Sequence, residues 1–145
     1  MGRRYAQHTE VPVAKSRGEI SSLLVQFGCN GISWTDKFDK PRSAIVSFVF
    51  PYDGMNLAAR FRMDLADGGD GRREHRVLLL WLKGALVAVE EGLVSPVEVF
   101  LANLVRRDGE TVYQSLQDNV VGFLQCDPGR MIEGDTEHNA EADRG

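Results

Sequence analysis

Long apolar runs, a dominant charge and a cysteine framework are all missing from this chain of 145 residues. The longest apolar stretch, residues 77–82, is much shorter than a membrane span and is followed by Lys83. The two cysteines, Cys29 and Cys126, stand far apart, so we expect free thiols, one of them in or near the core. The first residues lack the apolar segment of a secretory signal. We therefore expect a cytoplasmic protein without membrane contact.

Motifs of known reactions are missing too. The glycine-rich loop at 66–71 lacks the lysine and serine or threonine of a phosphate-binding loop, and also the ligand spacing of a calcium loop. His8, His75 and His138 are scattered, and neither cysteine has metal-ligand spacing to them. We therefore expect no enzyme, no metal site and no cofactor.

The net charge of −4 belongs to the C-terminal end of the chain. From Asp127 onward there are six acidic and two basic side chains, which leaves 15 of each sign before it. This segment has few large apolar groups to offset the entropy of ordering it. We predict an extended arm at 1–15, one domain at 16–126 and a disordered acidic tail at 127–145.

The first helix is predicted from a capping pattern and from apolar spacing. Ser16 and Glu19 form a capping box, and Gly28 has the position of a left-handed C-cap. Between them the apolar residues recur at helical spacing, which predicts a helix over 16–27; they are Ile20, Leu23, Leu24 and Phe27.

Three strands are predicted next, at 31–36, 43–50 and 55–65, with a turn at 51–54 that joins the last two in a hairpin. The third strand alternates strictly. Its arginines, Arg60 and Arg62, fall on one face. The other face is apolar and needs a core; it comprises Met55, Leu57, Ala59, Phe61, Met63 and Leu65.

Three helical segments complete the domain. Residues 72–91 are apolar nearly all round in their middle, which indicates a central helix buried on most sides. Ser95, Pro96 and Glu98 begin a short helix that carries apolar residues up to 105. A last helix begins at 111–114 and carries a predicted buried stripe of Leu116, Val120, Phe123 and Leu124. The order α-β-β-β-α-α-α predicts an α+β fold with helices on one face of a three-stranded antiparallel sheet.

The arginines are the first candidates for a binding site. The third strand leads through a short loop into the helix at 72–91, so we expect one contiguous patch of Arg60, Arg62, Arg72, Arg73 and Arg76, with Arg3 and Arg4 on the N-terminal arm. The alternative is a set of solvated charges paired with nearby carboxylates such as Asp64, Glu74 and Glu110. A patch free of carboxylates would favour nucleic acid, whereas alternation with acids would favour a protein surface or ordinary ion pairs.

The aromatic residues fall into two groups according to the polarity of their neighbours in the sequence. Phe48, Phe50 and Trp81 have apolar neighbours and are expected in the core. Trp34 lies among polar residues and is the best candidate for an exposed aromatic that contacts a partner.

The start "RRYAQHTEVPVAKSRGEISSLLVQFG" resembles a group of small, uncharacterised proteins of tailed bacteriophages and prophages. The likeness continues through "AIVSFVF", "ARFRM", "LKGALVAVEEGLVSPVEVFLANLV" and "RDGETV", and covers most of residues 3–116. This chain differs by a short glycine-rich loop and a shortened helix start where the group often has a longer polar insertion. The resemblance implies a phage origin and the cytoplasm of a bacterial host. It transfers no activity and no residue role.

Two classes of function compete, and an enzyme remains the third possibility. The protein binds and modulates or inhibits a host protein machine, such as a nuclease defence complex or RNA polymerase, or it is a nucleic-acid-binding accessory protein in phage replication or recombination. The charge balance before the tail favours the first class, since a nucleic-acid-binding domain is usually basic. We expect the partner at the outer face of the sheet or at Trp34, with arginines as anchors. Exposed strand edges leave a homodimer open.

Overall fold

The protein has an α+β fold in which one helix, a three-stranded antiparallel sheet and a series of helices follow in that order, as predicted. The computed structural model describes residues 9–125 and residue 129. The chain divides into two units, Met1–Tyr113 and Gln114–Gly145. The elements of the first unit are α1 (Val13–Phe27), β1 (Gly31–Lys37), β2 (Ser43–Tyr52), β3 (Met55–Asp64), α2 (Arg72–Glu90), α3 (Pro96–Phe100) and the 3₁₀ helix η1 (Leu101–Asn103).

The sheet is a meander with the strand order β1-β2-β3 and antiparallel pairing throughout. The predicted hairpin is confirmed, because Tyr52 pairs with Met55 across a two-residue turn. Asp53 and Gly54 both have positive φ, at 50° and 74°. Two successive positive φ values define the type I′ turn, whose twist matches that of paired strands.

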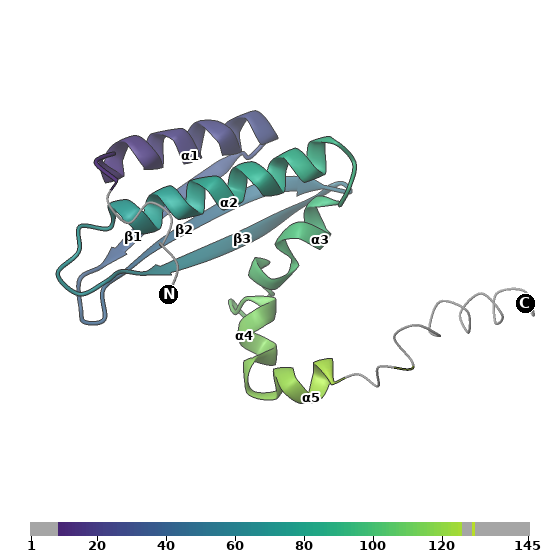
Figure 1. The fold of residues 1–145 in the computed structure, drawn as a ribbon. Helices are drawn as coiled ribbons and strands as arrows, with labels where there is room; N and C mark the ends of the chain where they lie inside the picture. The colour runs from purple at the N-terminus through teal and green to yellow at the C-terminus, as the bar shows by residue number, and fades with distance from the viewer. Residues whose placement is uncertain (1–8, 126–128, 130–145) are drawn as a thin grey trace, which may run out of the picture. The chain divides into compact units, whose positions relative to one another are not determined.

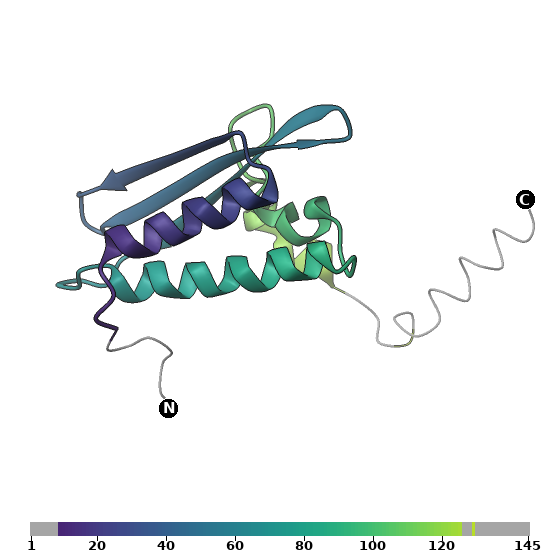
Figure 2. The ribbon, with the colours of Figure 1, turned by 90° about the horizontal axis from the view of Figure 1, so that it is seen from above.

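Helices α1 and α2 lie side by side on one face of the sheet (Figure 1), and the view from above shows them nearly parallel to each other (Figure 2). The core fills the space between this helix layer and the sheet. Phe100 of α3 is central to it, because its ring contacts aromatic rings from α1, β2, β3 and α2 at centroid distances of 5.5–6.2 Å. The contacting rings are those of Phe27, Phe48, Phe50, Phe61 and Trp81.

The first helix starts one turn earlier than predicted. Its N-cap is Pro12, whose carbonyl accepts hydrogen bonds from the backbone N–H of Lys15 and Ser16. The predicted capping box at Ser16 is therefore wrong, and residues 13–15 are helical rather than part of an extended arm. Ser16 lies on the same helix face as Ile20 and Leu24, and all three are fully buried. Packing of this small residue has taken precedence over its capping propensity. Gly28 does end the helix in the left-handed conformation, as predicted.

Helix α2 is amphipathic with a second apolar surface, which corrects the prediction that it is buried on most sides. One face is buried in the core and includes His75, Leu78, Leu79, Leu82, Ala85 and Leu86. On the other side Val77, Leu80, Trp81 and Val87 are exposed, and Trp81 has 45% of its surface accessible. Phe48 and Phe50 are buried as predicted, but the prediction for Trp81 is wrong.

Helix α3 begins with the predicted capping box, in which Ser95 accepts from the Glu98 N–H and the Glu98 carboxylate accepts from the Ser95 N–H. It is shorter than expected and ends at Phe100. After η1 the chain is extended, with Leu104 bridged to Ala59 of β3 and Val105 bridged to Thr111.

The last predicted helix is broken into three short pieces, α4 (Val112–Leu116), the 3₁₀ helix η2 (Gln117–Asn119) and α5 (Val120–Leu124). The predicted buried stripe is wrong here. Leu116 and Val120 are half-buried, and Phe123 and Leu124 each have 66% of their surface exposed. The 3₁₀ turn changes the angle between successive residues, so helical spacing in the sequence no longer places them on one face. The predicted tail, apart from Gly129, lies outside the described residues.

Candidate functional site

The structure separates the five arginines that were expected to form one patch. Ala59, Phe61 and Met63 of β3 are buried against the helices, so the alternate residues Arg60 and Arg62 point to the opposite face of the sheet. Arg72, Arg73 and Arg76 belong to α2, on the helix side. The prediction of one contiguous patch is therefore wrong, because a sheet divides successive residues between two faces. Arg3 and Arg4 lie outside the described residues.

Each arginine of α2 is also paired with a carboxylate. The Arg76 guanidinium lies 2.9 Å from Glu19 of α1, and this hydrogen bond is the largest cause that lowers the pKa of Glu19. The closest carboxylates to Arg73 and Arg72 are Glu74 at 3.0 Å and Asp70 at 3.1 Å. This alternation with acids favours a protein surface or ordinary ion pairs over a phosphate-binding stripe.

On the other side of the sheet, Arg60 and Arg62 are held by neighbouring groups. The Arg60 Nη1 donates to the Gly109 carbonyl at 2.9 Å, and the Arg62 Nε donates to the Asp64 Oδ1 at 3.0 Å. Arg60 is half-buried, whereas the side chain of Arg62 is 53% exposed.

These arginines belong to a surface that we call the open sheet face, the face directed away from α1 and α2. Its centre is formed by Ile45, Ser47 and Val49 of β2, which are half-buried. Their partners on the two neighbouring strands are exposed or half-buried. The flanking residues of the two outer strands, taken from the strand register, are Gly31, Ser33 and Thr35 of β1 and Ala58, Arg60 and Arg62 of β3. This face thus combines small, aliphatic and arginine side chains.

Trp34 is not on that face. It pairs with the buried Val46 and therefore points to the helix side, where it is half-buried. Its ring stacks on His75 at 5.7 Å between centroids, and the Arg17 guanidinium lies over the indole at 4.5 Å. The expectation of an exposed Trp34 is wrong because polar neighbours in a strand point to the other face or belong to the adjoining loop.

His75 is buried and joins three elements. Its Nδ1 lies 2.7 Å from the Gly71 carbonyl, and its Nε2 accepts from the Arg17 Nε at 3.0 Å. These partners assign the proton to Nδ1, because Nε2 must accept. Arg17 also donates two hydrogen bonds to Asp36, at 2.6 and 3.2 Å. We call this arrangement of Asp36, Arg17, His75 and Trp34 the Arg17 network.

Burial is the main cause that lowers the pKa of His75, and the hydrogen bond from Arg17 lowers the pKa of Asp36. Both ring nitrogens of His75 are occupied, so the ring has no free lone pair to act as a general base. The network therefore links α1, β1 and α2.

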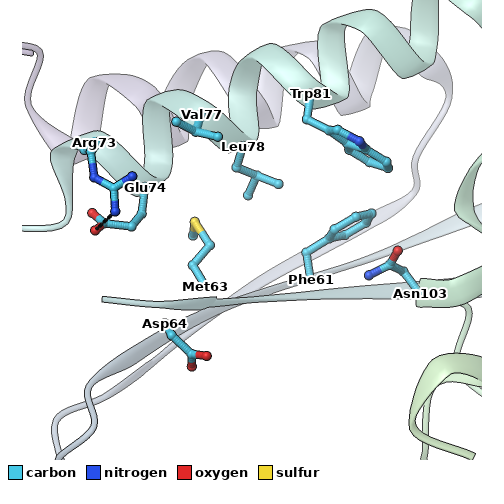
Figure 3. Close-up of a pocket in the computed structure, with 9 residues that line it drawn as sticks. All are labelled: Phe61, Met63, Asp64, Arg73, Glu74, Val77, Leu78, Trp81 and Asn103. Atoms are coloured by element: carbon cyan, nitrogen blue, oxygen red, sulfur yellow. Dashed lines mark hydrogen bonds and ion pairs between the residues drawn. The ribbon is translucent and has the colours of Figure 1, made fainter. Parts of the chain in front are cut away.

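An apolar groove of about 420 Å³ lies between α2 and the second half of β3. Figure 3 shows Val77, Leu78 and Trp81 pointing from the helix towards Phe61 and Met63 of the strand. The Arg73–Glu74 pair lies at one end. We call this surface the edge groove; its remaining lining residues are Asp64 and Asn103.

Beside the edge groove, β3 is the last strand of the sheet, and its outer edge is only half covered. The Val105 N–H donates to the Ala58 carbonyl at 2.8 Å, and the Asn103 side chain donates to the Arg60 carbonyl at 3.2 Å. Backbone groups alternate between the two edges of a strand, so those of Arg62 and Asp64 point to the same outer edge. In the described part of the chain, no backbone group pairs with them there.

Sequence reasoning missed the edge groove, although a signal was present. Val77 and Trp81 are four residues apart on a helix whose other face is also apolar, and a helix needs only one such face for the core. The Arg17 network had no comparable signal, since its members are up to 58 residues apart in the sequence.

Other chemistry finds little support in the described residues. They contain no group of three or more histidine, cysteine or acidic side chains placed to hold a metal ion. Burial raises the pKa of the Cys29 thiol to about 11, which makes it a poor nucleophile at neutral pH. None of the described helices has the length and apolar character needed to cross a membrane.

Comparisons with protein-family models, with curated proteins and with solved structures found no match to the chain.

Proposed function

We propose that this is a non-enzymatic, phage-encoded protein that binds and modulates or inhibits a host protein machine through the open sheet face. One observation carries the proposal: the five arginines of β3 and α2 are divided between two sides of the sheet and held by carboxylates or carbonyls. A surface that binds nucleic acid needs unneutralised cations, whereas arginines fixed among aliphatic side chains are typical anchors of protein interfaces.

The composition of the open sheet face supports this proposal. Ile45 and Val49 provide apolar area at its centre, and Arg60 is oriented beside them by the Gly109 carbonyl. An arginine that is already oriented loses less side-chain entropy when a partner binds. The resemblance of residues 3–116 to small phage proteins supports a bacterial host as the source of the partner.

The test is site-specific photo-crosslinking in host cells with a matched pair of serines. A photoreactive residue at Ser47 lies on the open sheet face, and one at the exposed Ser22 lies on α1. We expect one host protein to be crosslinked from Ser47 but not from Ser22, and the product to disappear with Val49→Glu. Equal labelling from both positions, or labelling that survives Val49→Glu, would contradict the proposal.

The nucleic-acid alternative is tested separately by fluorescence anisotropy of labelled DNA and RNA, single- and double-stranded. We expect no binding at low salt. Binding that weakens steeply with salt and is lost with Arg60→Glu would replace the protein-binding proposal by the alternative.

A further inference from the structure

We infer that the open half of the β3 edge pairs with the same edge of a second copy of this chain, so that two sheets join into one. This pairing involves the edge of the sheet, whereas the partner proposed above binds its open face. Three features carry it: unpaired backbone groups, a self-complementary charge pattern and the apolar edge groove.

The outer edge of β3 is covered at Ala58 and Arg60 by residues 103–105 and is open at Arg62 and Asp64. The open part thus offers two N–H and two C=O groups in a row. A strand edge of this kind is a template for pairing with another chain. A second β3, antiparallel to the first, would satisfy all of these groups.

The charges then select one register. Two-fold pairing centred on Met63 places Arg62 of each copy opposite Asp64 of the other, while keeping the open backbone groups in hydrogen-bonding positions. Moving the centre to Arg62 would place arginine opposite arginine, and moving it to Asp64 would place aspartate opposite aspartate. Opposite charges across a strand pair stabilise it and like charges destabilise it. Of these three registers, only the one centred on Met63 brings no like charges together.

The same register matches the apolar side chains on the helix side. Met63 meets its own copy at the two-fold axis, and Phe61 lies opposite Leu65 of the second copy. Of these side chains, Phe61 and Met63 line the edge groove together with Val77, Leu78 and Trp81 of α2. The exposed apolar side chains of α2 then lie next to apolar side chains of the second copy, because both copies use the same patch in an isologous interface.

In the single chain, Arg62 and Asp64 already form an ion pair with each other across one intervening residue. Their side chains are 53% and 74% exposed, so this internal pair contributes little to stability and its members are free to exchange partners. The dimer replaces two internal pairs by two pairs between copies, and the gain comes from the backbone hydrogen bonds and apolar contacts.

The first test uses charge reversal and the mass of the full chain in solution, measured by light scattering and sedimentation. We expect the wild type to have twice the chain mass of 16.1 kDa. Arg62→Asp or Asp64→Arg alone creates two like-charge pairs at the interface and should weaken association about tenfold to a hundredfold. The two single variants mixed in equal amounts should form a heterodimer, because the two reversed surfaces are complementary.

Recovery in the mixture separates an interface from a folding defect, because a misfolded variant is not rescued by another variant. Circular dichroism of each variant checks that the fold is kept. A wild type that stays monomeric up to its solubility limit would overturn the inference. So would single variants that associate like the wild type, or a mixture that does not associate.

The second test is disulfide trapping of the two-fold axis. In a background with Cys29→Ser and Cys126→Ser, a Met63→Cys variant places two thiols on directly opposed residues, within the Cα separation that a disulfide tolerates. We expect rapid formation of a covalent dimer under mild oxidation. Thr35→Cys on the exposed face of β1 is the matched control and should remain monomeric. Equal trapping at both positions would overturn the assigned edge.

Discussion

The two edges of the sheet differ in length, charge and cover. Strand β1 has seven residues and ends with the charged Asp36 and Lys37, and Asp39 and Lys40 follow it closely in the sequence. Strand β3 has ten residues, is half covered by residues 103–105, and borders the edge groove. Short, charged edges resist pairing with other chains, and long edges with apolar borders favour it. This contrast is the reason why we infer association at β3 and not at β1.

The largest effect is expected at the core beneath β3. Replacing Phe100 by alanine removes the ring that contacts aromatic groups from four other elements, and should lower the free energy of unfolding by about 3–5 kcal/mol. Urea denaturation measures the loss. The matched control is Phe38→Ala just after β1, whose ring is 78% exposed; it should change stability by less than about 0.5 kcal/mol. Similar losses in both variants would mean that the core is not centred on Phe100.

A pH-dependent loss of stability is expected on the β1 side, where His75 contacts Trp34. The pKa of His75 is lowered below its ordinary value of 6.5, so the unfolded chain takes up a proton at a higher pH than the folded chain. The stability from neutral His75 is therefore complete above pH 6.5 and decreases as the pH falls below that value. Asp36 and Glu19, whose pKa values are lowered from 3.8 and 4.5, lose their contributions only in more acidic solution.

Thermal unfolding between pH 7.5 and 5.5 therefore reports on His75 in the folded protein. We expect the midpoint to decrease over this range in the wild type and to decrease less in His75→Gln, which cannot be protonated. An unchanged pH dependence in the variant would assign the effect to another group.

A matched pair of aspartates compares the edges directly. Asp36→Asn on β1 removes the charge that holds Arg17, and should lower stability by about 0.5–1 kcal/mol, a figure reduced because the Asp36 side chain is 40% exposed. Asp64→Asn on β3 should change the stability of the fold by less, yet weaken association. Denaturation and sedimentation of both variants separate the two effects. A reversed result, with association lost in Asp36→Asn, would exchange the roles of the edges.

The smallest effect is expected at Arg60, which lies beside the covered half of β3. Arg60→Ala removes one hydrogen bond to the Gly109 carbonyl on a half-buried side chain, and should cost about 0.5 kcal/mol of stability. Association should be unchanged, because Arg60 lies outside the open half of the edge. Equilibrium denaturation and sedimentation again provide the measurements. If Arg60→Ala weakened the dimer as strongly as Asp64→Arg, the interface would have to extend to Arg60.

Local signals in the sequence were sufficient for most of the fold. The hairpin at Asp53 and Gly54, the cap at Gly28 and the capping box at Ser95 each depend on a few adjacent residues, and each prediction is confirmed. The alternation of β3 likewise identified Ala59, Phe61 and Met63 as core residues, because the period of a strand is fixed by its backbone.

The errors arose where distant parts of the chain decide the outcome. Ser16 is fully buried instead of capping α1, and Trp34 is covered by Arg17 and His75. The arginines of β3 and α2 are close in the sequence, but they lie on opposite sides of the sheet. The edge groove needs both the open end of β3 and the second apolar side of α2, and neither is visible in a single segment.

The meander also bears on the order in which the chain folds. Each strand pairs with its neighbour in the sequence, and a two-residue turn joins β2 to β3, so these contacts close short loops at small entropic cost. The contacts of Arg17 with His75 and of Glu19 with Arg76 close loops of 58 and 57 residues. Contacts between residues far apart in the sequence form late, because the entropy of closing the loop is lost before the contact contributes any stability. We therefore expect the β2–β3 hairpin to form first during folding, and the docking of α1 onto α2 to complete the fold.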